Sequence, residues 1–142
     1  MYFRFSEGDF KATLNEDLVR DFNFVKDNPA SCEPVQLLES RGLGTLPHTV
    51  EGDVDLTTSS VPCAVWTPFD QLLDPHTRSI RNPDEIREFF STNGVDLSSF
   101  PVTTCGRGVS ASIVTLCAYY ATGTLLPVYD GSWSEWSAKV KQ

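Results

Sequence analysis

The sequence predicts an α/β domain in which a parallel sheet of about five strands has helices on both faces. Short apolar runs alternate with longer helical patterns, and this alternation is typical of parallel strands joined by crossover helices. The chain has 142 residues, of which 40% are hydrophobic and 21% are charged. That length is enough for one domain with its own core. We therefore expect residues 1–142 to form a single domain that needs no metal or disulfide to fold.

The first predicted elements are a helix and a strand. Asn15 can cap a helix over 16–26, which Pro29 would end. The short apolar run 35–38 is too brief for a helix and predicts a buried strand. Polar residues follow this run directly, so we expect Arg41 to lie at the tip of the strand.

The middle of the chain predicts a loop, a strand and a capped helix. Residues 42–60 show no hydrophobic period, and we expect them to form a long surface loop. A strand is expected at 61–66. Asn82 and Pro83 are a helix start, with acidic residues in the first turn, and Gly94 ends that helix.

The last third of the chain alternates between strand and helix, with glycines at the boundaries. We expect a strand at 100–104, an apolar helix at 109–122, a strand at 125–129 and a last helix that carries Trp133 and Trp136. The two tryptophans are three residues apart, which favours a packing role on one helix face.

The charge balance limits the kinds of partner. The chain has 11 Lys and Arg against 19 Asp and Glu, and its net charge is −8. This balance argues against binding to nucleic acid or to an anionic membrane surface. No apolar run has the length of a membrane span, and the first residues lack the apolar core of a signal peptide. We expect a cytoplasmic location, or a mitochondrial one if a further segment precedes Met1.

Cysteine and histidine spacing does not predict a metal site. No Cys-x-x-Cys pair is present, so we do not expect a zinc site. We expect no other cofactor either. In a reducing compartment each cysteine is either a small buried hydrophobe or a reactive thiol. The residues concerned are Cys32, Cys63, Cys105, Cys117, His48 and His76.

The segment 105–110 carries the chemistry that the sequence predicts. It joins a strand to a helix, and ligands bind to parallel sheets at such positions. Gly106 and Gly108 allow the backbone N–H groups to turn inward, and the helix start adds partial positive charge. This cradle favours an anion and would stabilise the thiolate of Cys105, which makes Cys105 a candidate nucleophile. Arg107 adds a fixed positive charge beside it.

Two other interpretations of this segment are a glycine-rich turn around a structural cysteine and a phosphatase loop. The charge of Arg107 favours a functional site over the first. Cysteine phosphatases use a Cys-x5-Arg loop, but the sixth residue after Cys105 is Ala111. A phosphocysteine mechanism is therefore disfavoured.

Three stretches, 102–111, 118–119 and 128–136, resemble the catalytic half of the two-domain rhodaneses and mercaptopyruvate sulfurtransferases. A weaker resemblance covers nearly the whole chain, and residues 1–13 resemble the connector between the two domains of that family. The resemblance implies a rhodanese-like fold. It also implies a cysteine that passes through a persulfide while it transfers sulfur.

The resemblance assigns roles to individual residues. Cys105 takes the place of the nucleophile, and Arg41 and Arg107 would bind the anionic end of a small sulfur donor. The acceptor would be cyanide or a thiol. Position 106 matches the mercaptopyruvate enzymes, whereas a cation at 107 matches the thiosulfate enzymes, so the donor stays open between these two. The backbone cradle would consist of Gly106, Gly108, Val109 and Ser110.

Departures from the family pattern support an alternative function. Glu39 stands where the family has aspartate, and the sequence after Arg41 skips several residues, a second arginine among them. The amino-terminal half that walls one side of the family's pocket has no counterpart in residues 1–142. The alternative is a weakly active or inactive rhodanese-like module for interaction or regulation. Loss of the covering half would also expose apolar surface, which predicts self-association or docking to another domain.

Overall fold

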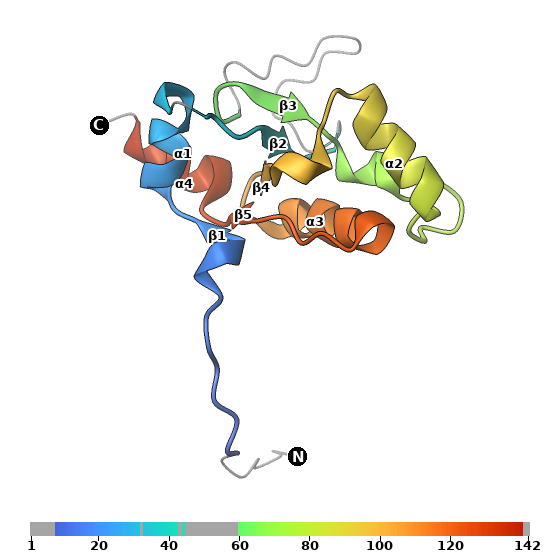
Figure 1. The fold of residues 1–142 in the computed structure, drawn as a ribbon, viewed down its shortest axis with the longest axis horizontal. Helices are drawn as coiled ribbons and strands as arrows, with labels where there is room; N and C mark the ends of the chain where they lie inside the picture. The colour runs from blue at the N-terminus through green and yellow to red at the C-terminus, as the bar shows by residue number, and fades with distance from the viewer. Residues whose placement is uncertain (1–7, 32, 43, 45–59, 141–142) are drawn as a thin grey trace.

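The computed structural model describes residues 8–31, 33–42, 44 and 60–140, and Figure 1 shows their arrangement. Within these residues, five strands form one sheet. The strands are β1 (Val19–Arg20), β2 (Leu37–Glu39), β3 (Ala64–Trp66), β4 (Val102–Thr104) and β5 (Val128–Tyr129). The helices are α1 (Phe22–Asp27), α2 (Pro83–Thr92), α3 (Val109–Thr122) and α4 (Ser132–Lys139), with 3₁₀ turns η1 (Glu16–Leu18), η2 (Asn28–Ala30), η4 (Phe69–Leu72) and η5 (Leu97–Ser99).

The sheet has the order β1-β5-β4-β2-β3, and every pair of neighbouring strands is parallel. This confirms the predicted fold class. The chain leaves β2 toward β3 on one side, but it leaves β4 through α3 toward β5 on the other side. Because β2 and β4 are neighbours, the connections that follow them diverge and open a crevice at their carboxyl ends. Such a switch in strand order is where open α/β sheets bind ligands.

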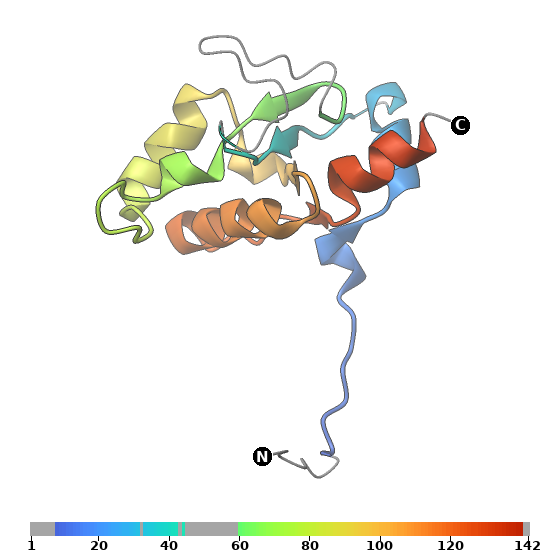
Figure 2. The same cartoon turned by 180° about the vertical axis from the view of Figure 1, so that it is seen from behind.

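Helices cover both faces of the sheet, as predicted, in pairs that Figures 1 and 2 show from opposite sides. Side chains alternate along each strand, so the adjacent residues Leu37 and Leu38 enter different cores. The core on the α2 and α3 face includes Leu38, Ile86, Phe90, Val114, Cys117 and Leu126. The core on the α1 and α4 face includes Val25, Leu37, Val102 and Tyr129, with Phe22 and Trp136 packed against it.

The observed ends of α2 and α3 agree with the signals in the sequence. At the start of α2, the Asn82 side chain accepts from the Glu85 backbone N–H at 3.0 Å, and the Glu85 carboxylate accepts from the Asn82 N–H in return. This capping box satisfies two backbone donors that a helix start leaves unpaired. The predicted span 109–122 is the observed span of α3, which ends at Gly123 with a φ of +77°.

The single helix expected over 16–26 is wrong. Asn15 caps only the short turn η1, and the chain then extends into β1, where Val19 pairs with Val128 of β5. The Asp21 side chain accepts from the Phe24 N–H at 2.8 Å and starts α1 as a separate helix. Pairing with a distant strand and a second cap at Asp21 therefore override the local helical pattern.

The strands expected at 61–66, 100–104 and 125–129 end where predicted but begin two or three residues later. Pro101 and Pro127 directly precede β4 and β5, and proline has no N–H for the strand ladder. Cys63 precedes β3 with a φ of +63°, which is outside the extended region. Each strand therefore starts only after its disrupting residue.

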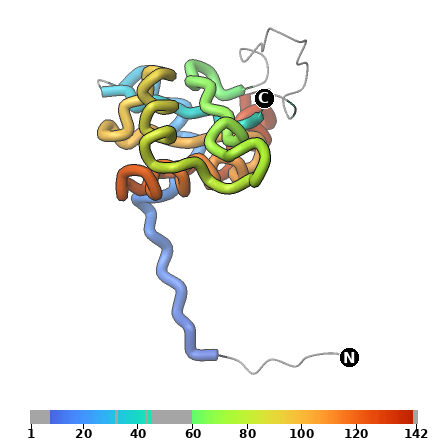
Figure 3. Tube along the Cα trace, turned by 90° about the vertical axis from the view of Figure 1, so that its right-hand side faces the viewer, coloured from blue at the N-terminus to red at the C-terminus, as the bar shows by residue number. Residues whose placement is uncertain are grey.

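At the N-terminal end, residues 8–14 extend away from the domain (Figure 3), and Phe10 is 90% exposed. The other seven residues of the connector-like stretch lie outside the described part of the chain, as does most of the loop predicted at 42–60. Cys32 and His48 also lie there. In the part of the chain that the structure describes, no helix is long and apolar enough to cross a membrane.

Candidate active site

A pocket of about 420 Å³ lies at the switch in strand order, where β2 and β4 end side by side. Parallel register places Glu39 opposite Thr104, so the residues that follow these two strands meet at one edge of the sheet. Six of the seven predicted site residues line or floor the pocket with two apolar neighbours. The lining consists of Arg41, Cys105, Gly106, Arg107, Val109 and Ser110, together with Phe69 and Ile113.

The seventh predicted residue, Gly108, shapes the loop without lining the pocket. Its φ is +84°, a conformation that favours glycine. A Cβ at this position would lie 3.1 Å from the backbone oxygen of Asp130. Gly108 therefore lets the loop turn into α3 while it packs closely against the segment that precedes α4.

Residues at the start of α4 form hydrogen bonds with the backbone of this loop. The Trp133 N–H donates to the Cys105 carbonyl at 2.9 Å. The Ser134 N–H and hydroxyl both donate to the Gly106 carbonyl, at 3.1 and 2.7 Å. These bonds hold the loop in a shape in which the Arg107 N–H and the Ala111 N–H donate to the Cys105 sulfur.

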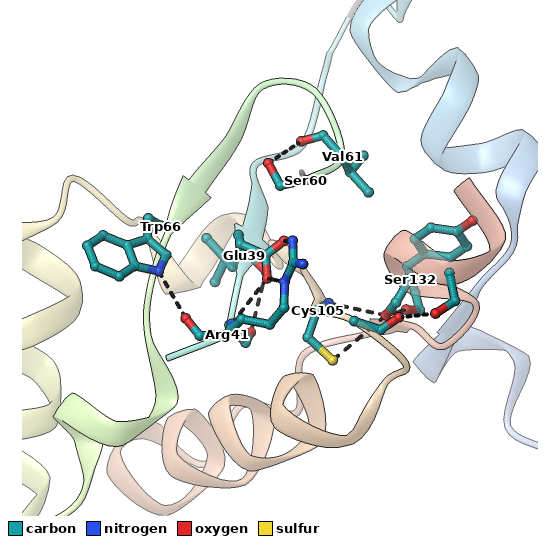
Figure 4. A network of polar contacts seen from close by, with 12 residues as sticks. Glu39, Arg41, Ser60, Val61, Trp66, Cys105 and Ser132 are labelled. Atoms are coloured by element: carbon teal, nitrogen blue, oxygen red, sulfur yellow. Dashed lines mark hydrogen bonds and ion pairs between the residues drawn. The ribbon is translucent and has the colours of Figure 1, made fainter. Parts of the chain in front are cut away.

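Ser132 is the centre of this network, as Figure 4 shows. Its buried hydroxyl accepts hydrogen bonds from the Cys105 and Gly108 N–H groups, both at 3.1 Å. It donates to the Tyr129 carbonyl at 2.8 Å, so its 4.0 Å contact with the Cys105 sulfur is the weaker one. Ser132 has a φ of +51°, an uncommon conformation for a serine that such a network can hold in place.

The Cys105 sulfur lies at the start of α3 among several donors. Burial alone raises the pKa of its thiol, but hydrogen bonds from the Ser110 hydroxyl and the Ala111 N–H lower it. The Arg107 N–H and the Ser132 hydroxyl act in the same direction, and the pKa of Cys105 lies below its ordinary value. The arrangement therefore favours a thiolate, which is the nucleophilic form of cysteine.

Arg41 reaches the pocket from β2, but its charge has a buried partner. Its Nε donates to Glu39 Oε1 at 2.9 Å, and its Nη2 donates to Glu39 Oε2 at 2.8 Å. Glu39 is fully buried, and the pair forms a two-point contact that fixes the guanidinium beside Cys105 (Figure 4). Trp66 of β3 donates from its indole N–H to the Arg41 carbonyl at 2.9 Å.

The remaining side chains that line the pocket differ in how exposed they are. Arg107 is exposed, and Val109 is 74% exposed, so both lie at the mouth. Phe69 comes from η4, and Ile113 comes from the second turn of α3. These two half-buried side chains give one wall of the pocket an apolar surface.

The other cysteines and the histidine that the structure describes do not line the pocket. Cys117 is buried in the core as predicted, and burial raises its pKa to about 11. Cys63 is exposed and free, and His76 lies in an exposed turn. Among the residues that the structure describes, no group of three His, Cys, Asp or Glu side chains could hold a metal ion.

Comparison with known proteins gives the family of the chain. No family model matches it. The thiosulfate sulfurtransferase of Gallus gallus is 38% identical over 133 residues, which cover 92% of this chain and 44% of that protein. The 3-mercaptopyruvate sulfurtransferase of Homo sapiens is 34% identical over 134 residues, which cover 94% and 44%. The chain belongs to the rhodanese and mercaptopyruvate sulfurtransferase family. It spans less than half the length of these two relatives.

Solved structures show the same fold for this rhodanese-family chain. SseA from Escherichia coli, described as a 3-mercaptopyruvate sulfotransferase with the rhodanese fold, matches with a TM-score of 0.67 and 22% identity over 91% of this chain and 47% of that one. Tum1 from Saccharomyces cerevisiae matches with a TM-score of 0.66 and 24% identity over 87% and 44%. The predicted rhodanese-like fold is confirmed.

Several residues of this rhodanese-family site were missed by sequence reasoning. Ser132 lies 27 positions after Cys105, and the sequence marks it only as part of the stretch 128–136 that resembles the family. Phe69 lies in an irregular turn. Ile113 lies in a helix whose apolar pattern predicts core packing. The partnership of Glu39 with Arg41 had a local signal, because these two opposite charges are two positions apart at the end of the predicted strand.

Proposed function

We propose that this chain is a sulfurtransferase domain in which Cys105 carries the transferred sulfur as a persulfide. The observation that supports this proposal most strongly is the set of donors around the Cys105 sulfur, which lowers the pKa of the thiol despite its burial. A thiolate that faces an open pocket with an exposed arginine at its mouth can attack an anionic sulfur donor.

The first half of the reaction moves a sulfur atom to the protein. The Cys105 thiolate attacks the outer sulfur of thiosulfate, a bond forms between the two sulfurs, and the sulfur–sulfur bond of the donor breaks. Sulfite leaves with the electron pair of that bond. The negative charge moves to the new terminal sulfur, where N–H donors of the loop and the start of α3 can stabilise it.

The second half returns Cys105 to its starting state. Cyanide or a thiol attacks the terminal sulfur of the persulfide, and the Cys105 thiolate leaves with the bond electrons. Thiocyanate or a new persulfide is the product. No oxidant or reductant enters at either step, because the sulfur atom carries its oxidation state from donor to acceptor.

Arg107 is the residue that would separate thiosulfate from 3-mercaptopyruvate as donor. Its guanidinium is exposed at the mouth of the pocket, where it can approach the oxygens of thiosulfate. Replacing it in Arg107→Ser should lower kcat/KM for thiosulfate more than for 3-mercaptopyruvate. An equal loss for both donors would show that the charge at this position does not select between them.

Turnover with thiosulfate and cyanide tests the proposal. The unmodified chain should form thiocyanate, and Cys105→Ser should abolish the reaction. Cys117→Ser is the matched control, because it removes a second cysteine that lies in the core instead of the pocket. Turnover that survives in Cys105→Ser would refute the role of Cys105.

The second candidate is a weakly active rhodanese-like module, and the Glu39–Arg41 pair favours it. A buried carboxylate that neutralises Arg41 weakens the attraction of this residue for an anionic donor. Titration of the Cys105 thiol by its alkylation rate discriminates between the two functions. An enzyme should show a midpoint below roughly 8.5, whereas an inert module should show the ordinary value or a higher one.

Weak self-association through α3 is part of the proposal. Val109, Leu116 and Tyr120 are exposed, and their spacing of seven and four residues places them on one stripe of the helix. The helix contains no charged residue, so two copies of this acidic chain can meet there with little repulsion. Sedimentation at increasing concentration should show a dimer that Leu116→Glu abolishes. A monomer at every concentration would refute this part.

A further inference from the structure

The backbone at the end of β2 is held by β3 and the segment that follows it. The Glu39 carbonyl accepts from the Thr67 N–H at 2.8 Å, which continues the ladder between the two strands. Arg41 lies two residues further along, and its carbonyl accepts from the indole N–H of Trp66 at 2.9 Å (Figure 4). A side chain therefore supplies a donor at a position where a regular parallel ladder uses a backbone N–H.

The turn into η4 explains why the ladder stops short of Arg41. The backbone donors of a parallel ladder come from alternate residues, so the next one after Thr67 is the N–H of Phe69. That N–H donates to the Ser40 carbonyl at 3.1 Å, because the chain bends into η4 at this residue. The indole of Trp66 takes the place of the missing ladder donor.

The position of the Arg41 backbone sets the place of its guanidinium in the pocket. The side chain lines the pocket, and a Cβ placed on Gly106 would lie 3.7 Å from its Cδ, so it packs on the Cys105 loop. The Glu39 carboxylate holds the guanidinium through both oxygens. Such a two-point contact has strict geometry, so a shift of the Arg41 backbone would change the distance from the guanidinium to the Cys105 sulfur.

We propose that Trp66 is a positioning residue, which keeps the Arg41 guanidinium beside the Cys105 sulfur through its indole N–H. Trp66 does not line the pocket, so its effect on an anion bound there passes through Arg41. Loss of the indole donor should let the strand end shift and should weaken the positive charge that an anion meets at Cys105. The effect on sulfur transfer rests on the proposed function, whereas the effect on the charge beside Cys105 does not.

Two alkylating reagents that differ in charge measure this effect. The Cys105 thiolate attacks the methylene carbon of iodoacetate or iodoacetamide, a carbon–sulfur bond forms, and iodide leaves with the electrons of the carbon–iodine bond. Iodoacetate carries one negative charge and iodoacetamide carries none, so the ratio of the two rates reports the positive charge beside the sulfur. Peptide mapping gives this ratio for Cys105 and, as a reference in the same sample, for the exposed Cys63.

Trp66→Phe removes the indole N–H and keeps an aromatic ring. We expect the ratio of the iodoacetate rate to the iodoacetamide rate at Cys105 to fall about threefold, because a charge contact in an open pocket is worth a factor of about two to five. The ratio at Cys63 should not change. An unchanged ratio at Cys105, or an equal fall at both cysteines, would overturn the proposal.

Trp136→Phe is the matched control. It removes the indole N–H of a tryptophan that packs against Phe22, with ring centroids 5.4 Å apart, and that does not line the pocket. Its ratio at Cys105 should equal that of the unmodified chain, and a threefold fall there would contradict a specific role for Trp66. Label on the buried Cys117 would reveal an unfolded variant. Trp66→Leu removes the same N–H and replaces Trp66→Phe in the comparison if that variant does not fold.

The path through Arg41 is tested in a chain without the buried ion pair. Glu39→Gln combined with Arg41→Gln removes both charges, so that neither is left buried alone. Addition of Trp66→Phe to this chain should leave the ratio at Cys105 where the double variant has set it. A further threefold fall would show that Trp66 acts by another route, against the proposal.

Sulfur transfer gives the second readout. With thiosulfate, Trp66→Phe should need about threefold more donor for the half-maximal rate of persulfide formation on Cys105, with a smaller change in the maximal rate, because donor binding is weakened. A fall in the maximal rate alone would count against positioning of Arg41. If no form of the chain accepts sulfur while the alkylation ratio still falls in Trp66→Phe, the proposed function is refuted and the role of Trp66 is supported.

Discussion

Removing the Ser132 hydroxyl should destabilise the Cys105 loop more than any other single change outside the loop. In Ser132→Ala, the Cys105 and Gly108 N–H groups lose their common acceptor while they stay buried. An unsatisfied buried donor costs about 1–3 kcal/mol, so the two together should lower the free energy of unfolding by about 3 kcal/mol. For a chain of this length, that loss corresponds to a fall in Tm of about 9 °C.

The backbone conformation of Ser132 requires its own control. Its φ of +51° is unfavourable for alanine as well as for serine but costs glycine little. Ser132→Gly therefore removes the hydroxyl and relieves the backbone at the same time. If the hydrogen bonds dominate, Ser132→Gly should also melt well below the unmodified chain, though above Ser132→Ala.

Differential scanning calorimetry gives the two Tm values, and the rate of iodoacetamide alkylation against pH gives the Cys105 pKa. Loss of order in the loop should raise the pKa of Cys105, because the donors to the sulfur are then no longer held in place. A Tm for Ser132→Ala within about 1 °C of the unmodified chain, with an unchanged alkylation midpoint, would refute the role of Ser132.

Three further predictions concern the same loop and its core. Ser110→Ala removes a donor to the sulfur, so the pKa of Cys105 should rise and the alkylation midpoint should move to higher pH; an unchanged midpoint would speak against this contact. Gly108→Ala combines a φ of +84° with a Cβ close to Asp130, and urea unfolding should show a loss of about 1–3 kcal/mol, whereas full stability would contradict the backbone argument. At pH 8, iodoacetamide should leave Cys117 unmodified in the folded chain, because burial raises its pKa to about 11, and mass mapping would reveal any label there.

Local sequence signals were enough for the part of the fold that surrounds Cys105. Gly108 and Gly123 mark the two ends of α3, and the Asn82 capping box marks the start of α2. These signals depend on backbone conformation within a few residues, and a sequence displays them directly. The prediction of a helix over 16–26 was wrong for the opposite reason. There β1 forms by pairing with Val128, which lies more than a hundred residues later in the chain.

The candidate site was predictable to a similar extent. Parallel strands bring their carboxyl ends to one edge, so the meeting of Arg41 and Cys105 follows from the topology. The place of Ser132 in the loop network does not follow, because it depends on how the chain enters α4 with a positive φ. The apolar wall around Phe69 depends on an irregular turn, and no sequence periodicity marks such a turn.

The most direct test of the account is the mass of the chain after exposure to a sulfur donor and removal of the excess. We predict a gain of one sulfur atom, peptide mapping that places it on Cys105, and its loss on addition of cyanide. Cys105→Ser should gain no sulfur under the same conditions. An unmodified mass with every donor, or sulfur found on Cys63 instead of Cys105, would contradict the proposal that Cys105 carries the transferred sulfur.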